Sequence, residues 1–435
     1  MQVRNPTLNS TPSGSHNALS NPNLRLYLSG QVVSMVGTWM QQMALSWLIY
    51  RLTNSEFMLG AIGFASQAPA FFLTPVAGIV ADRVNRHKLV ITTQTLAMIQ
   101  AGLLAAVVLS GHTQIWHLLV LGAFMGVINA FDMPGRQTFL VDMLRSPEEL
   151  PNAIAVNSSI VTLTRLAGPA IAGFCIAWFG EGICFLINAV SFVAVIIALL
   201  FIKPNVVRRP ASGKHPLAEM KEGFAYAFGF GPIRALILLL ALVSMFGMPY
   251  AVLMPAFAKN VFGGNATTLG WLTSAAGVGS LIGAVYLASR KGVLGLGRWI
   301  LISSLLFGAG LVGFGFSHWL VPSLLLLVLV GFGGMVQMAA TNTLLQTIVE
   351  EDKRGRVMSL FTMSFIGLAP FGSMVAGMLA DKIGTGPTVI GSGIICLLLG
   401  AAFGANFQQL RREVRPIYIE RGILQAENEM NVLNR

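Results

Sequence analysis

The chain has 435 residues, of which 54% are hydrophobic and 10% charged, and its formal net charge is +11. Soluble domains carry about 25% charged residues, so this chain has too little polar surface to cover a water-soluble particle. The basic balance does not indicate a nucleic-acid partner, because no basic stripe is interleaved with aromatic residues. The composition therefore predicts an integral membrane protein.

Apolar stretches of about 20–25 residues alternate with short charged runs, and such a stretch crosses a ~30 Å hydrocarbon core as a helix. In lipid, backbone groups must pair within the protein, so continuous apolar runs predict helices and not open strands. We expect an all-α membrane protein with twelve transmembrane helices, at 26–50, 57–80, 89–110, 116–140, 153–178, 182–202, 234–258, 268–289, 299–316, 320–346, 358–380 and 388–407.

The longest polar interruption lies mid-chain, where Pro204, Pro210 and Pro216 stand among mixed charges. We interpret it as a cytoplasmic linker, with a short surface helix over 217–228, between two pseudo-symmetric bundles of six helices. The expected divisions are a flexible cytoplasmic tail at 1–23, the first bundle at 24–203, the linker at 204–231, the second bundle at 232–408 and a cytoplasmic tail at 409–435.

The distribution of basic residues predicts the orientation. If the N-terminus is cytoplasmic and every span crosses once, 24 of the 28 Lys and Arg residues face the cytoplasm and three face outward. The remaining one, Arg165, lies inside a span. Because cytoplasmic loops carry an excess of Lys and Arg, we expect both termini in the cytoplasm.

Glycines indicate that the two halves are related. A triplet with spacings of five and seven residues occurs near the end of the fifth span and again, 204 residues later, near the end of the eleventh: Gly168, Gly173 and Gly180, then Gly372, Gly377 and Gly384. Corresponding positions in a six-plus-six layout favour a duplicated bundle.

The loop after the second span reads Gly78-Ile-Val-Ala-Asp82-Arg83-Val-Asn-Arg86-His-Lys88. It resembles the signature loop of the major facilitator superfamily, in which Gly, three residues, Asp and a basic residue precede further basic residues. A glycine lets another helix approach closely, and Asp82 can accept hydrogen bonds from a helix N-terminus and pair with an Arg. We interpret this loop as a conformational latch, formed by Gly78, Asp82, Arg83, Arg86 and Lys88. The alternative is an ordinary basic loop.

Three further segments resemble one branch of that superfamily, which includes enterobactin exporters and transmembrane secretion effectors: Asp132 to Arg136, Arg165 to Pro169, and the second-half inner loop with Arg354, Gly355 and Arg356. The likeness covers nearly the whole chain. It implies a monomeric secondary transporter that exports small amphipathic molecules, siderophores or drugs, by alternating access. Lysophospholipid transporters have a similar build, so a lipid cargo is the alternative.

Arg165 is expected near the membrane midplane, about 18 Å along the fifth span. An Arg there costs ~2.5–3.5 kcal/mol unless it faces a cavity or a partner. One hypothesis is that Arg165 lines the central cavity and attracts anionic groups of the substrate. The other is a structural ion pair, with Asp132 as a candidate partner.

Asp132 and Arg136 lie one helical turn apart in the inner third of the fourth span. We expect them to form either a gate, in which Asp132 carries a coupling proton, or a permanent structural pair. Asp132 is the one carboxylate well inside a predicted span, and all six histidines fall in loops, tails or span ends.

Uncharged amides are further candidates for the cavity, since amides facing lipid are costly. We expect Gln41, Gln42 and Asn157 to line it, with interhelical hydrogen bonding as the alternative. No phosphate-binding loop, HExxH motif or zinc-type cysteine pair occurs, so we expect no cofactor, metal or ATPase activity. A membrane enzyme would need a cluster of His, Asp or Glu that the spans lack, and a non-transporting scaffold would not need the latch loop.

Overall fold

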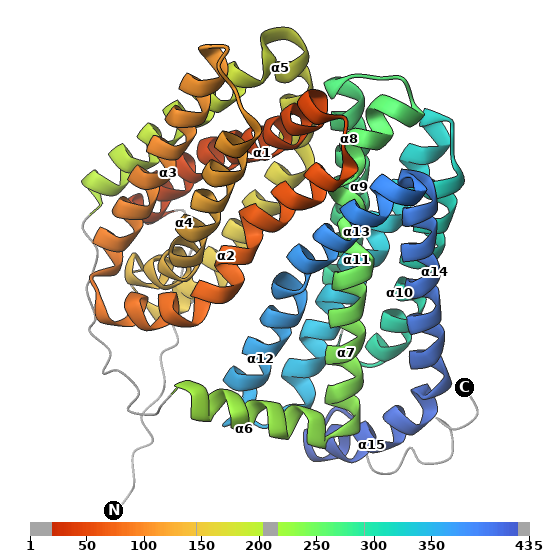
Figure 1. The fold of residues 1–435 in the computed structure, drawn as a ribbon. Helices are drawn as coiled ribbons and strands as arrows, with labels where there is room; N and C mark the ends of the chain where they lie inside the picture. The colour runs from red at the N-terminus through yellow and green to blue at the C-terminus, as the bar shows by residue number, and fades with distance from the viewer. Residues whose placement is uncertain (1–19, 145, 203–215, 291, 425–435) are drawn as a thin grey trace, which may run out of the picture.

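In a computed structural model of the chain, described over residues 20–144, 146–202, 216–290 and 292–424, every regular element is a helix (Figure 1). The first half contains α1 (Pro22–Thr53), α2 (Glu56–Arg83), α3 (Arg86–Leu109), α4 (Ile115–Asp142), η2 (Pro147–Glu149) and α5 (Leu150–Phe201). The second half contains α6 (Pro216–Gly229), α7 (Gly231–Phe246), η3 (Met248–Ala251), α8 (Met254–Ala256), η4 (Phe257–Val261), α9 (Ala266–Ser289), α10 (Leu296–Phe316), α11 (Leu320–Ile348), α12 (Arg354–Thr362), η5 (Met363–Gly367), α13 (Ala369–Ile383), α14 (Thr385–Ala405) and α15 (Phe407–Glu420).

Eleven segments of the described chain are long and apolar enough to cross a membrane, and they match the second to twelfth predicted spans. The first predicted span lies within α1, a helix of 32 residues that is less apolar because it contains three glutamines. Two of these, Gln31 and Gln41, are buried against neighbouring helices, so their amides do not face lipid. The all-α membrane fold is therefore confirmed.

The fifth and sixth predicted spans correspond to Leu150–Phe179 and Glu181–Phe201 within α5, and the chain turns between them at Gly180, whose φ is 79°. Two other spans contain irregular turns. The seventh span is interrupted by the 3₁₀ turn η3 and the π-helix η4, and the eleventh by the π-helix η5 between α12 and α13. Such π segments leave a local irregularity in the helix and often occur at functional sites.

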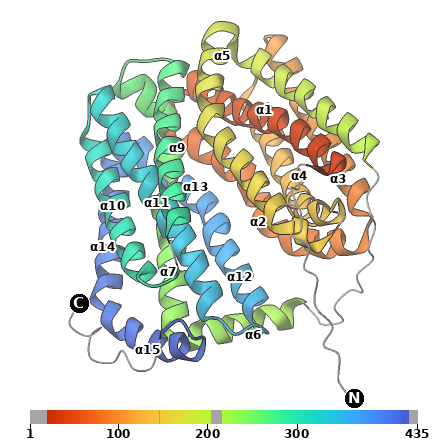
Figure 2. The same ribbon diagram turned by 180° about the vertical axis from the view of Figure 1, so that it is seen from behind.

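Helices α1–α5 form one bundle and α7–α14 form the other, side by side (Figures 1 and 2). Helices α6 and α15 lie across one end of the second bundle, and we call this side of the molecule the linker end. The two bundles meet at the opposite end and along two seams, one between α2 and α13 and one between α5 and α9. Toward the linker end the two groups of helices diverge. The expected tail at 1–23 lies mostly outside the described residues, whereas the expected tail at 409–435 begins as part of α15.

The repeated glycine triplet has the same role in both halves. A Cβ at Gly168 would lie 2.7 Å from the Cβ of Trp39 on α1, and one at Gly372 would meet the Met245 carbonyl on α7. The middle glycines sit in the two seams, where Gly173 faces Gly270 of α9 and Gly377 faces Gly60 of α2. The last glycines, Gly180 and Gly384, have φ of 79° and 90°, a conformation that L side chains rarely adopt. The shared contacts support the internal duplication.

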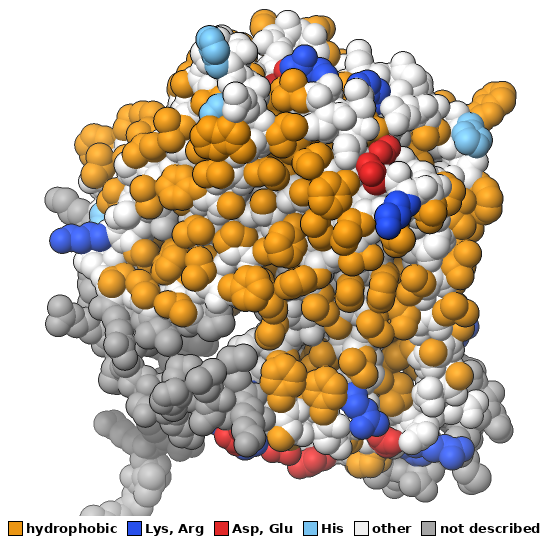
Figure 3. Space-filling view, in the orientation of Figure 1, with side chains coloured by type: hydrophobic (Ala, Val, Ile, Leu, Met, Phe, Trp, Pro, Cys, Tyr) orange, Lys and Arg blue, Asp and Glu red, His pale blue; other side chains and the backbone are white. Residues whose placement is uncertain are grey.

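Apolar side chains cover the middle of the molecule, and charged side chains gather toward its two ends (Figure 3). Large apolar residues such as Leu200 and Leu325 are mostly exposed, which in water would create an aggregating surface. In a bilayer these side chains contact acyl chains. The exposed Trp178 and Trp319 lie at the opposite end, where aromatic residues anchor helices at the membrane interface.

Candidate transport pathway

A polar network joins the two bundles at the opposite end. The Tyr50 hydroxyl on α1 donates to a Glu56 carboxylate oxygen at 3.0 Å and accepts from the Asn260 amide of the second bundle at 2.6 Å. Thr385 of α14 donates to the same Glu56 oxygen at 3.5 Å. Tyr50 and Glu56 thus connect four helical segments, α1 and α2 of the first half with η4 and α14 of the second.

Two more hydrogen bonds cross the same boundary. The Ser55 hydroxyl donates to Asp381 Oδ1 at 3.0 Å, and Lys259 Nζ donates to Asn54 Oδ1 at 2.5 Å. Within the first bundle, Arg51 forms a bidentate ion pair with Glu181, with N···O distances of 2.8 and 3.1 Å. The four hydrogen bonds that cross the boundary, together with the glycine seams beside them, close the interface between the bundles at the opposite end.

Asp132 is the centre of a buried polar network in the first bundle. Its Oδ1 accepts from Thr93 Oγ1 at 2.7 Å and from Gln94 Nε2 at 2.8 Å, both on α3. Its Oδ2 lies 2.5 Å from Arg136 Nε, one turn further along α4. Arg136 also donates to Gln31 Oε1 on α1 at 2.6 Å. Both carboxylate oxygens are paired, so the network ties α1, α3 and α4 together.

Gln41 was expected in the cavity, but the structure places it in the core of the first bundle. It is 4% exposed, donates to Gln100 Oε1 at 2.9 Å and accepts from Asn188 Nδ2 at 2.8 Å. Both the NH₂ group and the oxygen of its amide are therefore hydrogen-bonded to other helices. This is the interhelical hydrogen bonding that was the alternative expectation for Gln41. Gln42 is exposed, and Asn157 is half-buried on α5, about 12 Å from Arg165 toward the linker end.

Arg165 lies on the face of α5 between the other bundle and α1. A Cβ at Gly277 of α9 would lie 3.1 Å from Leu166 Cα, and Gly168 faces Trp39 of α1. With 3.6 residues per turn, Arg165 projects between these two directions. It is residue 16 of the 30-residue span Leu150–Phe179, and its side chain is exposed. The arrangement directs the guanidinium to the space between the bundles, at mid-span.

The guanidinium of Arg165 has no hydrogen bond or ion pair to any described residue. Tyr250 of the second bundle, itself 9% exposed, lies close enough for an electrostatic interaction. The hypothesis of an ion pair between Arg165 and Asp132 is wrong, because Asp132 is paired with Arg136 on its own helix. Sequence reasoning missed Tyr250, since nothing in its local pattern distinguishes it from a packing tyrosine.

The latch loop shows a different arrangement at the linker end. Arg86 pairs with Asp142 at the end of α4, with an N···O distance of 3.0 Å, and Lys88 is exposed. No atom of the described residues lies within 4 Å of a Cβ added at Gly78, so none of the described helices approaches it here. The roles expected for Asp82 and Arg83 concern side chains outside the described part of the chain. A closed latch therefore stays a prediction.

The linker helix α6 forms ion pairs with the second-half inner loop, and we call this contact the clasp. Glu222 of α6 lies 2.6 Å from Arg356 Nη1 and 3.0 Å from Lys353 Nζ, and a Cβ at Gly223 would meet Arg356 Cβ at 2.9 Å. The hydrogen bond from Lys353 lowers the pKa of Glu222 below its usual value. Arg354 makes a longer contact, 3.8 Å, with Glu351, and Gly355 has open space around it. The role of Glu222 in these ion pairs was not predicted from the sequence, because the run of charged residues around it is typical of a solvated surface.

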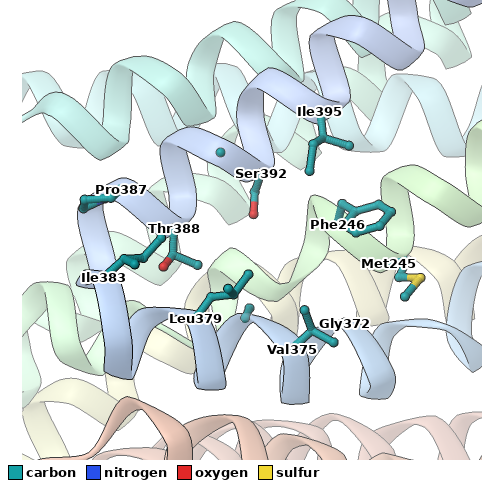
Figure 4. Close-up of a pocket in the computed structure, with 12 residues that line it drawn as sticks. Met245, Phe246, Gly372, Val375, Leu379, Ile383, Pro387, Thr388, Ser392 and Ile395 are labelled. Carbon is teal, nitrogen blue, oxygen red and sulfur yellow. The ribbon is translucent and has the colours of Figure 1, made fainter.

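A pocket of about 130 Å³ lies between α7, α13 and α14 (Figure 4). It is lined by apolar side chains, among them Phe246, Leu379 and Ile383, with the hydroxyls of Thr388 and Ser392. Leu379 and Ile383 are 45% and 55% exposed, so the pocket opens on the side of the second bundle. Its lining includes no charged side chain, and it lies apart from Arg165.

Comparison with known proteins agrees with this architecture. A family model described as transmembrane secretion effector matches residues 13–416. The chain belongs to this family. It is therefore a multi-pass membrane protein of the major facilitator superfamily, a secondary transporter and not an enzyme.

Its relatives include a siderophore transporter and two efflux proteins. The staphyloferrin A transporter of Staphylococcus aureus is 26% identical over 86% of this chain and 94% of its own length. The multidrug efflux pump Tap of Mycolicibacterium fortuitum is 24% identical, over 90% and 98% of the two chains. Macrolide efflux protein A of Streptococcus pyogenes is 25% identical, over 85% and 93%.

Solved structures confirm the fold of this secretion-effector family member. A peptide transporter of the POT type superposes with a TM-score of 0.72 at 13% identity, covering 90% of this chain and 95% of its own. A bacterial homolog of the human lysosomal transporter Spinster gives a TM-score of 0.68 at 16% identity, covering 91% and 98%.

Proposed function

We propose that this transporter exports small amphipathic molecules, of the siderophore or drug type, from the bacterial cytoplasm across the inner membrane. The observation that carries the proposal is the position of Arg165, a cation at mid-span that pairs with no described residue and projects between two bundles closed at one end only. Relatives named for multidrug and macrolide efflux support an export direction, and a relative named for staphyloferrin A transport supports a siderophore-type cargo.

The linker end is the cytoplasmic face in this proposal. The basic residues of the latch loop, of the loop before α12 and of α15 all lie at that end, as cytoplasmic loops require. Both termini then lie in the cytoplasm. The arrangement of the helices corresponds to a transporter open to the cytoplasm and closed to the outside, the state that loads an exported cargo.

Alternating access follows from the two seams. Glycine faces glycine where α2 meets α13 and where α5 meets α9, so backbones approach without interlocking side chains. Surfaces of this kind allow the two bundles to rotate relative to one another at a small cost in free energy. Opening outward requires breaking the four hydrogen bonds between the bundles at the opposite end. We propose that the latch loop then closes the cytoplasmic end, with a helix approaching Gly78.

Asp132 is the proposed carrier of a coupling proton. It is the single carboxylate that the described spans hold deep in the bundle, and its oxygens contact Arg136, Thr93 and Gln94. Protonation would release Arg136 and loosen α4 from α1 and α3. A transport rate that does not depend on a pH gradient would contradict this role, without affecting the export proposal.

Export is tested with the full chain in a strain that lacks its own efflux pumps. Cells expressing it should retain less of at least one member of a panel of siderophores and amphipathic dyes than cells expressing the Gly377→Leu variant. The added side chain would push α13 from α2 at the seam, where a Cβ at Gly377 already lies 2.8 Å from Gly60 Cα. The matched control is Gly102→Leu, at a position with open space. Equal retention with wild type and G377L for every compound would contradict the proposal.

A further inference from the structure

We infer that the transported molecule carries a carboxylate, bound inside the membrane by Arg165 of the first bundle and by the hydroxyl of Tyr250 of the second. This inference rests on the proposed export function and specifies its cargo. It depends on geometry: one exposed guanidinium at mid-span, one tyrosine from the facing bundle and no anion of the described residues between them.

The charge of Arg165 is not neutralised by the described protein. The buried carboxylate in the same bundle, Asp132, is already paired with Arg136. At the opposite end Glu181 pairs with Arg51, and Glu56 accepts from Tyr50 and Thr385. Each of these anions therefore has its own partner. An Arg at mid-membrane costs ~2.5–3.5 kcal/mol, and an anionic ligand would offset that cost.

The single cation favours a carboxylate over a phosphate. A guanidinium presents parallel N–H donors that match the two oxygens of a carboxylate, and the pair is neutral. A phosphate monoester carries about −1.5 to −2 charges at pH 7, so one Arg would leave negative charge unpaired within the membrane. Tyr250 can add a neutral donor without adding charge. The apolar side chains around the bundles suit the rest of an amphipathic molecule.

The division of the site between two bundles has a mechanistic consequence. Arg165 is beside the α5–α9 seam on the first bundle, whereas Tyr250 belongs to η3 of the second. When the bundles rock about the seams, the two donors change their separation. The carboxylate would then hold both groups in the loading state and lose one of them after the switch, which lowers its affinity on the outer side.

The inference is tested by binding of dansylaminoundecanoate, an amphipathic fluorescent carboxylate, and of its uncharged methyl ester. Both are titrated onto the full chain in nanodiscs, and dansyl emission is measured. Wild type should bind the acid more tightly than the ester. Arg165→Gln should weaken binding of the acid by about tenfold or more, as expected when a charged hydrogen bond is lost, and leave the ester unchanged. Tyr250→Phe should weaken binding of the acid by a smaller factor.

The control is Arg298→Gln, which removes an exposed positive charge at the linker end. It should bind both compounds as wild type does. Equal affinity of wild type for the acid and the ester, no binding of either, or unchanged binding of the acid by R165Q would overturn the inference. Transport of both compounds in proteoliposomes is measured separately: transport of the ester alone would uphold export and reject the carboxylate, and selective binding without transport would do the reverse.

Discussion

Two arginines of the first bundle, Arg136 and Arg165, lie inside membrane-spanning helices with opposite surroundings. Arg136 is joined to Asp132 and Gln31 in a closed network among three helices. Arg165 projects between the bundles and has Tyr250 as its neighbour, with no protein anion described beside it. A paired charge stabilises one arrangement of helices, whereas an unpaired charge at mid-span is available to a ligand. The contrast separates a residue that holds the bundle together from one that meets the cargo.

The largest expected effect follows from removing one member of the buried pair. Asp132→Ala leaves the guanidinium of Arg136, whose side chain is 23% exposed, beside neutral groups. Removing one member of a fully buried pair costs about 3–5 kcal/mol, which is the upper bound for this half-buried one. We expect a large loss of folded protein and of thermal stability in detergent. Glu351→Ala, at a side chain that is 87% exposed, is the control and should behave as wild type. A stable D132A variant would show that the network is not structural.

Arg165 should give the reverse pattern. Arg165→Gln removes a cation that has no partner among the described residues, so the thermal stability should stay at the wild-type value or rise. Export should fall about ten- to a hundredfold, because a charged hydrogen bond to a ligand is worth about 1.5–3 kcal/mol. Arg165→Lys should retain part of the activity. A fall in stability as large as that of D132A would mean that Arg165 is also a structural residue.

Neutralising both members of the pair should cost less than removing one. In the double variant Asp132→Asn with Arg136→Gln, amides can keep hydrogen bonds to Thr93, Gln94 and Gln31, and no charge is left unpaired. Replacing a buried ion pair as a unit is often nearly neutral for stability. Thermal unfolding should therefore be close to wild type, while any dependence of export on a pH gradient should be lost. A double variant as unstable as D132A would refute the pairing.

The smallest effect is expected at an ion pair in water, between Glu222 of α6 and the loop before α12. The pKa of Glu222 is lowered by the hydrogen bond from Lys353, so the clasp persists above the usual glutamate pKa and is lost as the pH falls through the lowered value. Hydrogen exchange of the α6 amides should therefore accelerate only at acid pH. Glu222→Gln should show the fast exchange already at pH 7. Equal exchange in both proteins at pH 7 would show that the clasp does not hold the linker.

The sequence predicted the part of this contrast that is local. Asp132 and Arg136 are one helical turn apart, so their pairing follows from helical periodicity, and eleven of the predicted spans follow from apolar length. The surroundings of Arg165 depend on which helices pack beside it, and that information is spread over distant parts of the chain. The same reason explains why Gln41 was wrongly expected in the cavity and why Tyr250 and Glu222 were missed. Amides and tyrosines have the same local pattern in a core as in a cavity.

The central claim is that two rigid bundles open alternately at the two ends. It is tested most directly by distances between spin labels on paired positions, His112 with His318 at the opposite end and Lys88 with Arg298 at the linker end, in the full chain. Addition of a transported compound should lengthen the first distance and shorten the second within the same sample. Two distances that stay fixed, or that lengthen together, would contradict the account.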